Sequence, residues 1–239
     1  MNWSLASDKG LLRPSNEDSL CAEPALGLFA VADGMGGHQA GEVASQTAIA
    51  ELVRYLRENL SAFPDPAEAL VNGVQAANRL VFHLSSSYRS LRGMGTTLTA
   101  ALVRGNELFW AHVGDSRLYL LRGRELVRLT EDHSLVQELV RRGGLREEQA
   151  RFHPHRSVLT RALGIEPEVR VDSDRLMLRS GDRLLLCTDG LTEHLSDEEI
   201  AAVASNCAAV AEAVGRLVEM ALRRGGTDNI SIILLAVGE

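Results

Sequence analysis

The stretch TTLTAALVRGNELFWAHVGDSRLYLLRGRELVRL, residues 96–129, decides the fold. It contains apolar and β-branched runs that alternate with short polar breaks, each with a glycine. The runs are 96–103, 107–113, 117–121 and 125–129, and the breaks are 104–106, 114–116 and 122–124. Connections this short suit antiparallel hairpins, because parallel strands need a longer, usually helical, crossover. The middle of the chain therefore predicts antiparallel sheet.

Amphipathic helices are expected on either side of this stretch. Residues 39–59 place their apolar side chains on one helical face. Asp65 is expected to cap a second helix, with Pro66 at its first position and Glu68 closing a capping box. Further strands are expected at 168–174, 182–188 and 230–237, and further helices after Ser196 and over about 207–224. The pattern predicts two helix pairs around antiparallel sheets.

Composition and charge exclude several classes of function. The chain has 239 residues and a formal net charge of −7, which gives no support for nucleic acid or an anionic membrane as main partner. Lys9 is the only lysine, so a Schiff-base mechanism or a P-loop lysine has almost nothing to work with. No window approaches about 20 unbroken apolar residues, and no signal peptide is recognisable at the N-terminus.

The cysteines favour a reducing compartment. Cys21, Cys187 and Cys207 lie far apart and include no CxxC pair, so they form neither a disulfide framework nor a zinc site. We expect a cytoplasmic protein folded as a single domain over residues 1–239. The segment at about 134–164 interrupts the strand rhythm and is expected to form an inserted flap.

Aspartates stand where predicted strands begin or end. Asp33 follows the apolar run 26–32, Asp189 follows the run 184–188, and Asp228 comes shortly before the last strand. Because an unpaired buried carboxylate is costly, several converging ones suggest a cation between them. Oxygen-only ligands favour Mg²⁺ or Mn²⁺ over zinc. Each motif alone is also compatible with a turn or a helix cap.

Two further polar motifs extend this set. In the motif RPSNED, residues 13–18, Arg13 either joins a surface ion-pair cluster or holds a phosphate in a bidentate grip. In the second case Glu17 and Asp18 would hold metal-bound waters. Asp115, in the motif GDSR, either sits in a tight hairpin turn or faces a further cation. Together the carboxylates predict a metal-dependent hydrolase, in which two ions clamp a phosphoryl group and activate water.

The motifs, taken in order, resemble those of the PP2C-type metal-dependent serine/threonine protein phosphatases in their compact bacterial form. They span nearly the whole chain. The matching motifs are RPSNED (13–18), VADGMGGH (31–38), GMGTT (93–97), VGDSR (113–117), LTEDHS (129–134), LTRALG (159–164), LCTDGL (186–191) and GTDNIS (226–231).

The resemblance implies both a fold and a site. The fold would be an α+β, four-layer α-β-β-α sandwich, with metals in a cleft at one edge of two antiparallel sheets. A hydroxide between two Mn²⁺ or Mg²⁺ ions would attack phosphorus without a phosphoenzyme intermediate. The implied residues are Asp33 bridging both ions, Asp189 and Asp228 on one, the Gly34 carbonyl, Glu17 and Asp18 on the other, Asp115 on a possible third, and Arg13 on the substrate phosphate.

Position 35 departs from the wider family. Eukaryotic members carry a histidine there, proposed as the general acid, whereas this chain has Met35. His38 lies nearby and either protonates the leaving alkoxide or caps the following helix; a metal-bound water is the other candidate acid. The flap arginines either face solvent or contact phosphoprotein substrate; they are Arg141, Arg142, Arg146, Arg151, Arg156 and Arg161.

The expected function is hydrolysis of phosphoserine and phosphothreonine on proteins. The alternative is a catalytically silent PP2C-like binding or scaffold module, which would be expected to have lost Asp33, Asp189 or Asp228; all three are present. A regulatory phosphatase confined to one partner would usually carry a sensor domain, for which this chain has no room. The implied partners are phosphorylated proteins, substrates of a bacterial Ser/Thr kinase, and the expected oligomeric state is a monomer.

Overall fold

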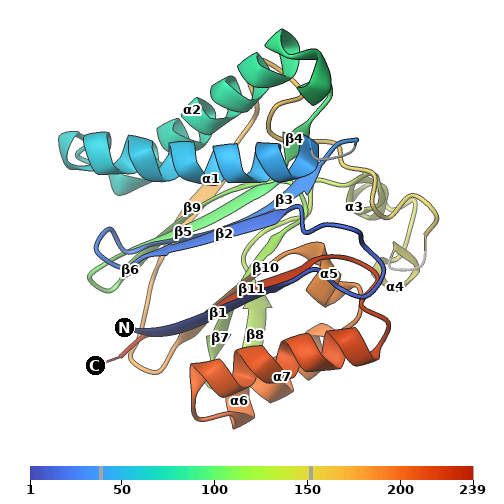
Figure 1. The fold of residues 1–239 in the computed structure, drawn as a ribbon. Helices are drawn as coiled ribbons and strands as arrows, with labels where there is room; N and C mark the ends of the chain where they lie inside the picture. The colour runs from blue at the N-terminus through green and yellow to red at the C-terminus, as the bar shows by residue number, and fades with distance from the viewer. Residues whose placement is uncertain (38–39, 151–152, 239) are drawn as a thin grey trace.

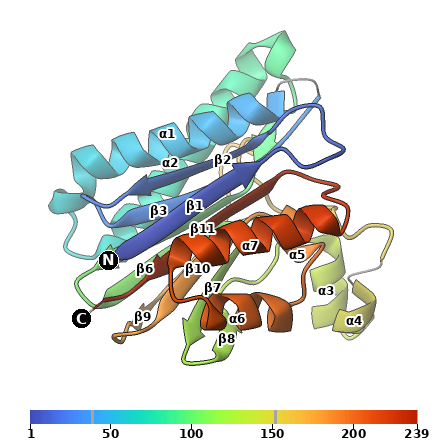
Figure 2. The ribbon, with the colours of Figure 1, turned by 60° about the horizontal axis from the view of Figure 1, so that its bottom comes forward.

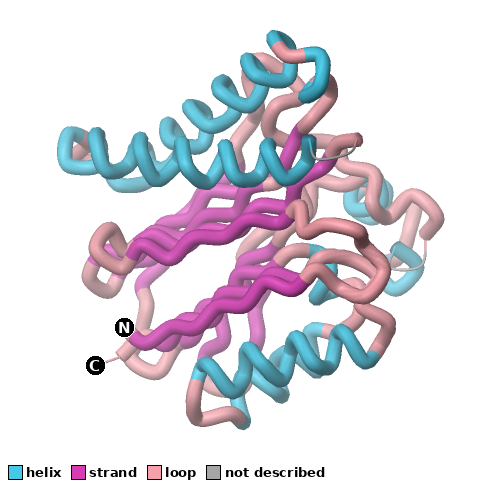
Figure 3. The backbone as a smooth tube through the Cα atoms, in the orientation of Figure 1, coloured by secondary structure: helices cyan, strands magenta, loops and turns pink. Residues whose placement is uncertain are grey.

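The protein is a sandwich of two antiparallel sheets with helices on both outer faces (Figures 1 and 3). The computed structural model describes residues 1–37, 40–150 and 153–238. The first sheet has the order β1 (Asn2–Asp8), β11 (Ile230–Ala236), β10 (Arg183–Cys187), β7 (Arg117–Arg122), β8 (Glu125–Arg128). The second has the order β2 (Asp18–Glu23), β3 (Leu28–Met35), β5 (Leu98–Arg104), β6 (Glu107–Val113), β9 (Asp172–Met177), and β4 (Gly95–Thr96) pairs with β3.

Two helix pairs cover the sheets, as Figure 2 shows from below. Helices α1 (Ala40–Asn59) and α2 (Pro66–Ser87) pack on the second sheet, and α6 (Asp197–Asn206) and α7 (Val210–Arg223) pack on the first. Asp65 caps α2 by accepting the N–H of Ala67. The reciprocal bonds of a capping box are found at Ser196 and Glu199, at the start of α6. The α+β sandwich is confirmed.

Alternation along the central strands explains their nearly continuous apolar sequence. In β5, Leu98, Ala100 and Leu102 belong to the core under α1 and α2. Ala101 and Val103 instead belong to the core between the two sheets. Because successive side chains of a strand point to opposite faces, a strand covered on both faces needs apolar residues at every position. Two of the three hairpins predicted from residues 96–129 are confirmed by the antiparallel pairing of β5 with β6 and of β7 with β8. The hairpin predicted at 114–116 is wrong, because β6 and β7 belong to different sheets and this short connection crosses between them.

The strand predicted at 168–174 is wrong at its start. Pairing with β6 begins only at Asp172, opposite His112. Upstream, side chains of α2 bind backbone carbonyls: Gln75 donates to Val169 and Asn78 to Glu166. These bonds use groups that a strand would pair, so the apolar segment packs on the helix instead. The last helix begins at Val210, because Cys207 ends α6 as its C-cap.

The predicted flap projects from the sandwich beside the ends of β3 and β10 (Figures 1 and 2). Its described part contains the short helices α3 (Leu135–Arg141) and α4 (Glu147–Ala150). Antiparallel bridges join Ser134 to Leu159 and Thr96 to Leu163. The flap is thereby fixed to β4, which pairs with the end of β3.

The two ends of the chain lie side by side at the opposite edge (Figure 1). Strands β1 and β11 pair with Asn2 opposite Ala236. The remaining short elements are 3₁₀ turns at Leu60–Ala62 (η1) and Arg89–Leu91 (η2), and the helix α5 (Asp189–Thr192). Within the described ranges, no helix combines the length and apolar character needed to span a membrane.

Candidate metal centre

The predicted acidic residues meet at one edge of the sandwich. Asp18 and Asp33 are opposite each other in the β2–β3 ladder. Asp189 begins α5 directly after β10, and Asp228 lies just before β11. Because β10 and β11 are antiparallel neighbours, the end of one and the start of the other lie at the same edge. The structure thus brings carboxylates from both ends of the chain together.

The backbone of Asp33 is fixed by the two threonines of the GMGTT motif. Its N–H donates to Thr97 Oγ1 at 2.8 Å, and its carbonyl accepts from the Thr97 N–H at 2.9 Å and from Thr96 Oγ1 at 2.8 Å. Thr97 Oγ1 also lies 2.7 Å from Ser116 Oγ, next to Asp115. The bonds satisfy the backbone of Asp33 and leave its carboxylate available to a ligand.

Electrostatics at this edge disfavour ionised carboxylates in the absence of a cation. Burial, followed by the charges of Asp18 and Asp189, raises the pKa of Asp33 well above its ordinary value. Burial and the charge of Asp115 do the same to the pKa of Asp189. Burial also raises the pKa values of Asp18 and Asp115, each to about 7. Folding buries these carboxyl groups together, which costs free energy when they are ionised. A positive charge between them would offset that cost.

Two carboxylate oxygens at this edge lack the hydrogen bonds that buried polar atoms normally form. Asp18 Oδ1 and Asp189 Oδ1 are buried and have no hydrogen-bond partner among the residues that the structure describes. Buried polar atoms in native proteins are almost always paired, so orphaned carboxylate oxygens call for a missing ligand. Oxygen donors of this kind suit a hard divalent cation. No three acidic, His or Cys side chains in the described ranges are already gathered as a cation cage, so ion binding would draw the carboxylates closer.

Glycines let three segments approach closely around Glu17. The Gly34 N–H donates to the Glu17 carbonyl at 3.1 Å. A Cβ on Gly34 would lie 2.0 Å from the carbonyl oxygen of Gly41, and one on Gly41 would lie 2.2 Å from Glu17 Oε2. No side chain fits at either position. The Asp-Gly pair therefore has a packing reason as well as its predicted ligand role.

Arg13 reaches the same edge from the β1–β2 connection. Its Nη2 lies 2.6 Å from Asp228 Oδ2, and its side chain is about half exposed. Part of the guanidinium thus holds a predicted metal ligand in place, while the rest faces solvent. This position suits an arginine that binds an incoming phosphate beside the ions.

Asn229 is a functional candidate that the sequence did not single out. It is buried, and its Nδ2 donates to the carbonyls of Lys9 and Ser15, both at 2.9 Å. Its Oδ1 accepts from the Glu17 N–H at 2.7 Å. One amide therefore shapes the whole connection that carries Arg13 and Glu17. A signal was present in the sequence: an amide follows Asp228 directly before an apolar strand.

The turn that carries Asp115 is held by a buried histidine that was also not predicted. His133 Nδ1 accepts from the Gly114 N–H at 3.0 Å, and the backbone N–H of His133 donates to the Gly114 carbonyl at 2.7 Å. His133 Nε2 lies 3.1 Å from Asp172 Oδ2, and Asp172 is paired with Arg161 at 2.7 Å. Burial lowers the pKa of His133, which favours the neutral ring that can accept this bond.

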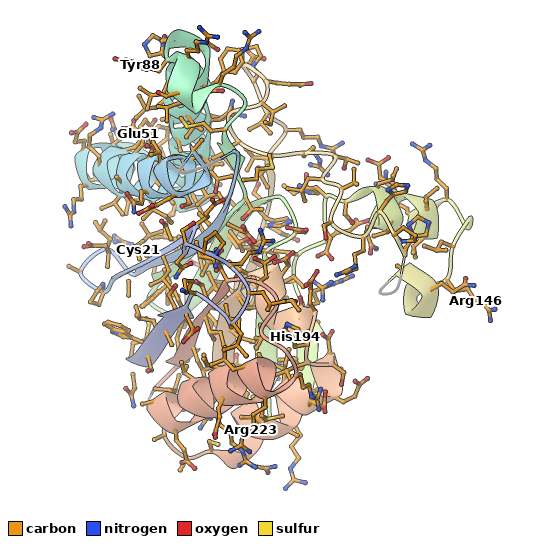
Figure 4. All side chains as sticks on the ribbon, turned by 45° about the vertical axis from the view of Figure 1, so that its right-hand side comes forward. Cys21, Glu51, Tyr88, Arg146, His194 and Arg223 are labelled. Carbon is orange, nitrogen blue, oxygen red and sulfur yellow. The ribbon has the colours of Figure 1, made fainter. Side chains whose placement is uncertain are left out.

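The flap arginines differ in the side chains that they contact. Arg156 lies 3.2 Å from Glu193, and Arg161 belongs to the Asp172 cluster. Arg142, the C-cap of α3, pairs with Glu138 of that helix. Figure 4 shows Arg146 at the outer tip of the flap, away from His194 and the carboxylate edge. His38 and Arg151, predicted from the motifs, lie outside the described residues.

A groove of about 750 Å³ runs beside the carboxylates. Asp115 and Asp189 lie in its wall, together with Gln137 and Arg156 of the flap and Thr227 of the opposite loop. The Thr227 N–H donates to His194 Nε2 at 3.0 Å, which fixes this loop next to Asp228. The carboxylate edge is therefore open to a ligand between the flap and α5.

Comparison with known proteins assigns the family. Residues 15–227 match the model of the family described as Protein phosphatase 2C. The serine/threonine protein phosphatase PstP of Mycobacterium tuberculosis is 44% identical over 240 residues, which cover 99% of this chain and 45% of PstP. The chain thus spans about half the length of that relative. Protein phosphatase PhpP of Streptococcus pneumoniae is 36% identical over 243 residues, covering 100% of this chain and 98% of PhpP.

Solved structures of bacterial serine/threonine phosphatases have the same fold as this chain. A crystal structure of the M. tuberculosis phosphatase PstP/Ppp superposes with a TM-score of 0.92 at 43% identity, covering 100% of this chain and 99% of that one. The structure of the PstP catalytic domain in complex with two manganese ions superposes with a TM-score of 0.90 at 42% identity. The match covers 100% of this chain and 98% of that one. With its sandwich fold and its carboxylate edge, the chain belongs to the protein phosphatase 2C family.

Proposed function

We propose that the protein is a metal-dependent phosphatase that hydrolyses phosphoserine and phosphothreonine on proteins. The observation that carries the proposal is the pair of buried, unpartnered oxygens, Asp18 Oδ1 and Asp189 Oδ1, at the edge where strands of both sheets end. The names of the relatives PstP and PhpP and the two manganese ions in the PstP complex support the activity and its metal.

The roles of the site residues belong to the same proposal. Asp33 would serve both of two Mn²⁺ or Mg²⁺ ions, because burial and then the charges of Asp18 and Asp189, which are proposed ligands of different ions, raise its pKa. The other proposed ligands are Asp189 and Asp228 on one ion, Glu17, Asp18 and the Gly34 carbonyl on the other, and Asp115 on a third. Bound ions would supply Lewis acidity toward the phosphoryl oxygens and lower the pKa of water.

The protein groups bind and orient the substrate. The exposed part of the Arg13 guanidinium would hold two phosphate oxygens, while its bond to Asp228 aligns the phosphate with the ions. Asn229 would keep Arg13 and Glu17 in register through its three bonds to their connection. Protonation of the leaving alkoxide by His38 stays a prediction.

Hydrolysis of p-nitrophenyl phosphate and of a phosphothreonine peptide, each titrated with Mn²⁺, tests the activity. We expect turnover that requires the metal and is lost in Asp189→Ala and in Asp33→Asn. Asp174→Ala is the matched control, because Asp174 is an exposed aspartate of β9 away from the site. Folded wild-type protein that binds Mn²⁺ without turnover would favour the silent scaffold module instead.

Location, partners and assembly form a further part of the proposal. Three free cysteines, two of them buried, are compatible with a reducing cytoplasm. A bacterial Ser/Thr kinase would supply the phosphoprotein substrates. A single catalytic domain over 1–239 that acts as a monomer is the simplest arrangement, and light scattering of purified protein measures it.

A further inference from the structure

A second cavity lies behind the carboxylate edge, where α2 ends and the chain returns from the flap. Its volume is about 770 Å³, and its wall contains Tyr88, Arg89 and Arg92 after α2, and Gly164 and Ile165 after the flap. In Figure 4, Tyr88 marks this end of α2, far from the flap tip at Arg146. The cavity shares no residue with the groove at Asp115 and Asp189.

The charge of this cavity is opposite to that of the chain. The wall contains two arginines and no carboxylate, whereas the whole chain carries a formal charge of −7. Arg89 and Arg92 are both exposed, and neither forms an ion pair with a residue in the described ranges. Three of the flap arginines named above, Arg142, Arg156 and Arg161, are instead paired with carboxylates. Two neighbouring guanidinium groups are thus available to an anion.

Exposed apolar groups lie beside these charges. Tyr88 is 56% exposed and Ile165 is 48% exposed. Ile165 has a fixed position, because the neighbouring Gly164 N–H donates to Asn78 Oδ1 and Leu163 pairs with Thr96. An aromatic ring, an aliphatic side chain and two arginines form the mixed surface that a peptide contacts. A simple inorganic anion would need no such apolar rim.

The cavity adjoins the carboxylate edge through β4. A Cβ on Gly95 would lie 2.7 Å from Met35 Cε and 2.9 Å from Ile165 Cδ1, so both side chains lie close to this glycine. Met35 follows Asp33 by two residues on β3 and pairs with Gly95. A chain bound in the cavity would therefore reach the metal centre across Ile165 and Met35.

We propose that this cavity binds an acidic segment of the phosphoprotein substrate, at a distance in sequence from the phosphorylated residue. The proposal rests on the proposed phosphatase function and adds a substrate class to it. Nucleic acid is the less suitable polyanion, because the remainder of an acidic chain would repel a long one. The cationic wall would favour substrates with a run of Asp or Glu and would act mainly on KM.

Arg89 also lies just past the C-terminus of α2, where a positive charge stabilises the helix dipole. That role predicts a loss of stability on substitution but no change in the choice between peptides. The two roles are therefore separated by a substrate comparison, with thermal denaturation as the readout for the helix.

The experiment uses two phosphothreonine peptides that differ only in a distal run, glutamate in one and glutamine in the other. For the wild type we expect kcat/KM to be roughly threefold to tenfold higher for the glutamate peptide, through KM, with the advantage falling as salt is added. In the double variant Arg89→Gln/Arg92→Gln the advantage disappears, while p-nitrophenyl phosphate hydrolysis is unchanged. The matched control Arg104→Gln/Arg216→Gln removes two exposed arginines elsewhere and retains the advantage.

Equal kcat/KM for both peptides in the wild type, or an advantage that survives in the double variant, would overturn the proposal. If the double variant is unstable, the single variants Arg89→Gln and Arg92→Gln give the same comparison. If the wild type hydrolyses no phosphate ester, the phosphatase function fails, and fluorescence anisotropy of an unphosphorylated glutamate-run peptide still tests the cavity. Tighter binding of single-stranded DNA than of that peptide would also contradict it.

Discussion

Thr188 Oγ1 donates a hydrogen bond to Asp18 Oδ2 at 2.8 Å and so joins the end of β10 in one sheet to the start of β2 in the other. The same hydroxyl accepts from the Ser231 N–H at 3.0 Å. One buried oxygen atom therefore fixes a proposed metal ligand relative to three strands. The second oxygen of Asp18 has no partner in the described ranges and could bind an ion or a bound water.

Thr188→Val should weaken both the fold and the ion site. Valine has a similar shape but leaves the Ser231 N–H and Asp18 Oδ2 without a partner, which costs about 1–3 kcal/mol for a buried group. Urea denaturation measures this loss, and calorimetric titration with Mn²⁺ measures the accompanying drop in affinity. Thr188→Ser keeps the hydroxyl and is the control. If Thr188→Val were as stable as the wild type, the hydrogen bonds of the Thr188 hydroxyl would not contribute to the stability of the fold.

The metal-free protein should become less stable as pH rises from about 4 to about 7. Burial raises the pKa of Asp18 and of Asp115 to about 7, whereas an aspartate in an unfolded chain titrates near about 3.9. Between these values the folded protein binds more protons than the unfolded chain, so the free energy of unfolding falls with rising pH. Urea midpoints in EDTA should be higher at pH 5 than at pH 7.5. Asp18→Asn should flatten this dependence, and a midpoint that rises with pH would contradict the assignment.

Mn²⁺ should reverse that trend. A cation replaces the protons on the carboxylates, so its affinity and its stabilising effect grow as pH rises. At a free concentration of 100 times the dissociation constant, one ion adds about 2.7 kcal/mol to the free energy of unfolding. Thermal melts with and without Mn²⁺ at pH 5 and 7.5 test this, with Asp189→Ala as the variant that should lose the increase. Equal shifts at both pH values would argue against ions held by these carboxylates.

His133→Ala should loosen the turn that carries Asp115. The substitution removes the acceptor of the buried Gly114 N–H and the link to Asp172, so we expect a loss of about 1–3 kcal/mol in stability. At saturating substrate, we expect half-maximal turnover to require a higher Mn²⁺ concentration, because the proposed third ion depends on Asp115. His155→Ala, an exposed flap histidine, is the control. An unchanged Mn²⁺ dependence would limit His133 to a packing role.

Arg13→Ala should chiefly raise KM, because holding a phosphate contributes largely equal binding in the ground and transition states. We expect roughly tenfold or more, the loss of a charged hydrogen bond of about 1.5–3 kcal/mol. Arg13→Lys keeps the charge but loses the bidentate geometry of the guanidinium. We expect its KM to lie between those of the wild type and Arg13→Ala. Steady-state kinetics with p-nitrophenyl phosphate measure both constants. An unchanged KM would leave Arg13 as a surface partner of Asp228 only.

The sequence predicted the elements whose signals are local. The strand at 107–113 has the predicted bounds, because a short break with a glycine interrupts the apolar sequence at each of its ends. The start of α2 is likewise marked by Asp65 and Pro66. Asp189 was placed correctly just past the end of a strand, where an aspartate and a glycine interrupt an apolar run. The strand end predicted before Asp33 is wrong, because β3 continues through Asp33 to Met35 by pairing with β4.

Contacts between distant parts of the chain could not be predicted in this way. Asn229 binds the carbonyl of Lys9 across 220 positions, and Thr188 binds Asp18 across 170. Neither bond leaves a periodic pattern in the sequence. The misplaced strand at 168–174 has the same cause, because Gln75 and Asn78 capture its backbone from a helix far upstream.

The pairing of Asn2 with Ala236 places both termini at the edge of the sandwich opposite the carboxylate edge (Figure 1). A tether, tag or additional domain joined to either terminus would leave the sandwich on the side away from the flap, as Figure 1 shows, and would not cross the carboxylate edge. Since the two termini are neighbours, a short linker between them and new ends opened in the exposed turn at Arg104 would yield a circular permutant that keeps every strand pair. Such a rearranged chain should retain its ion site, because no segment that builds it would be cut.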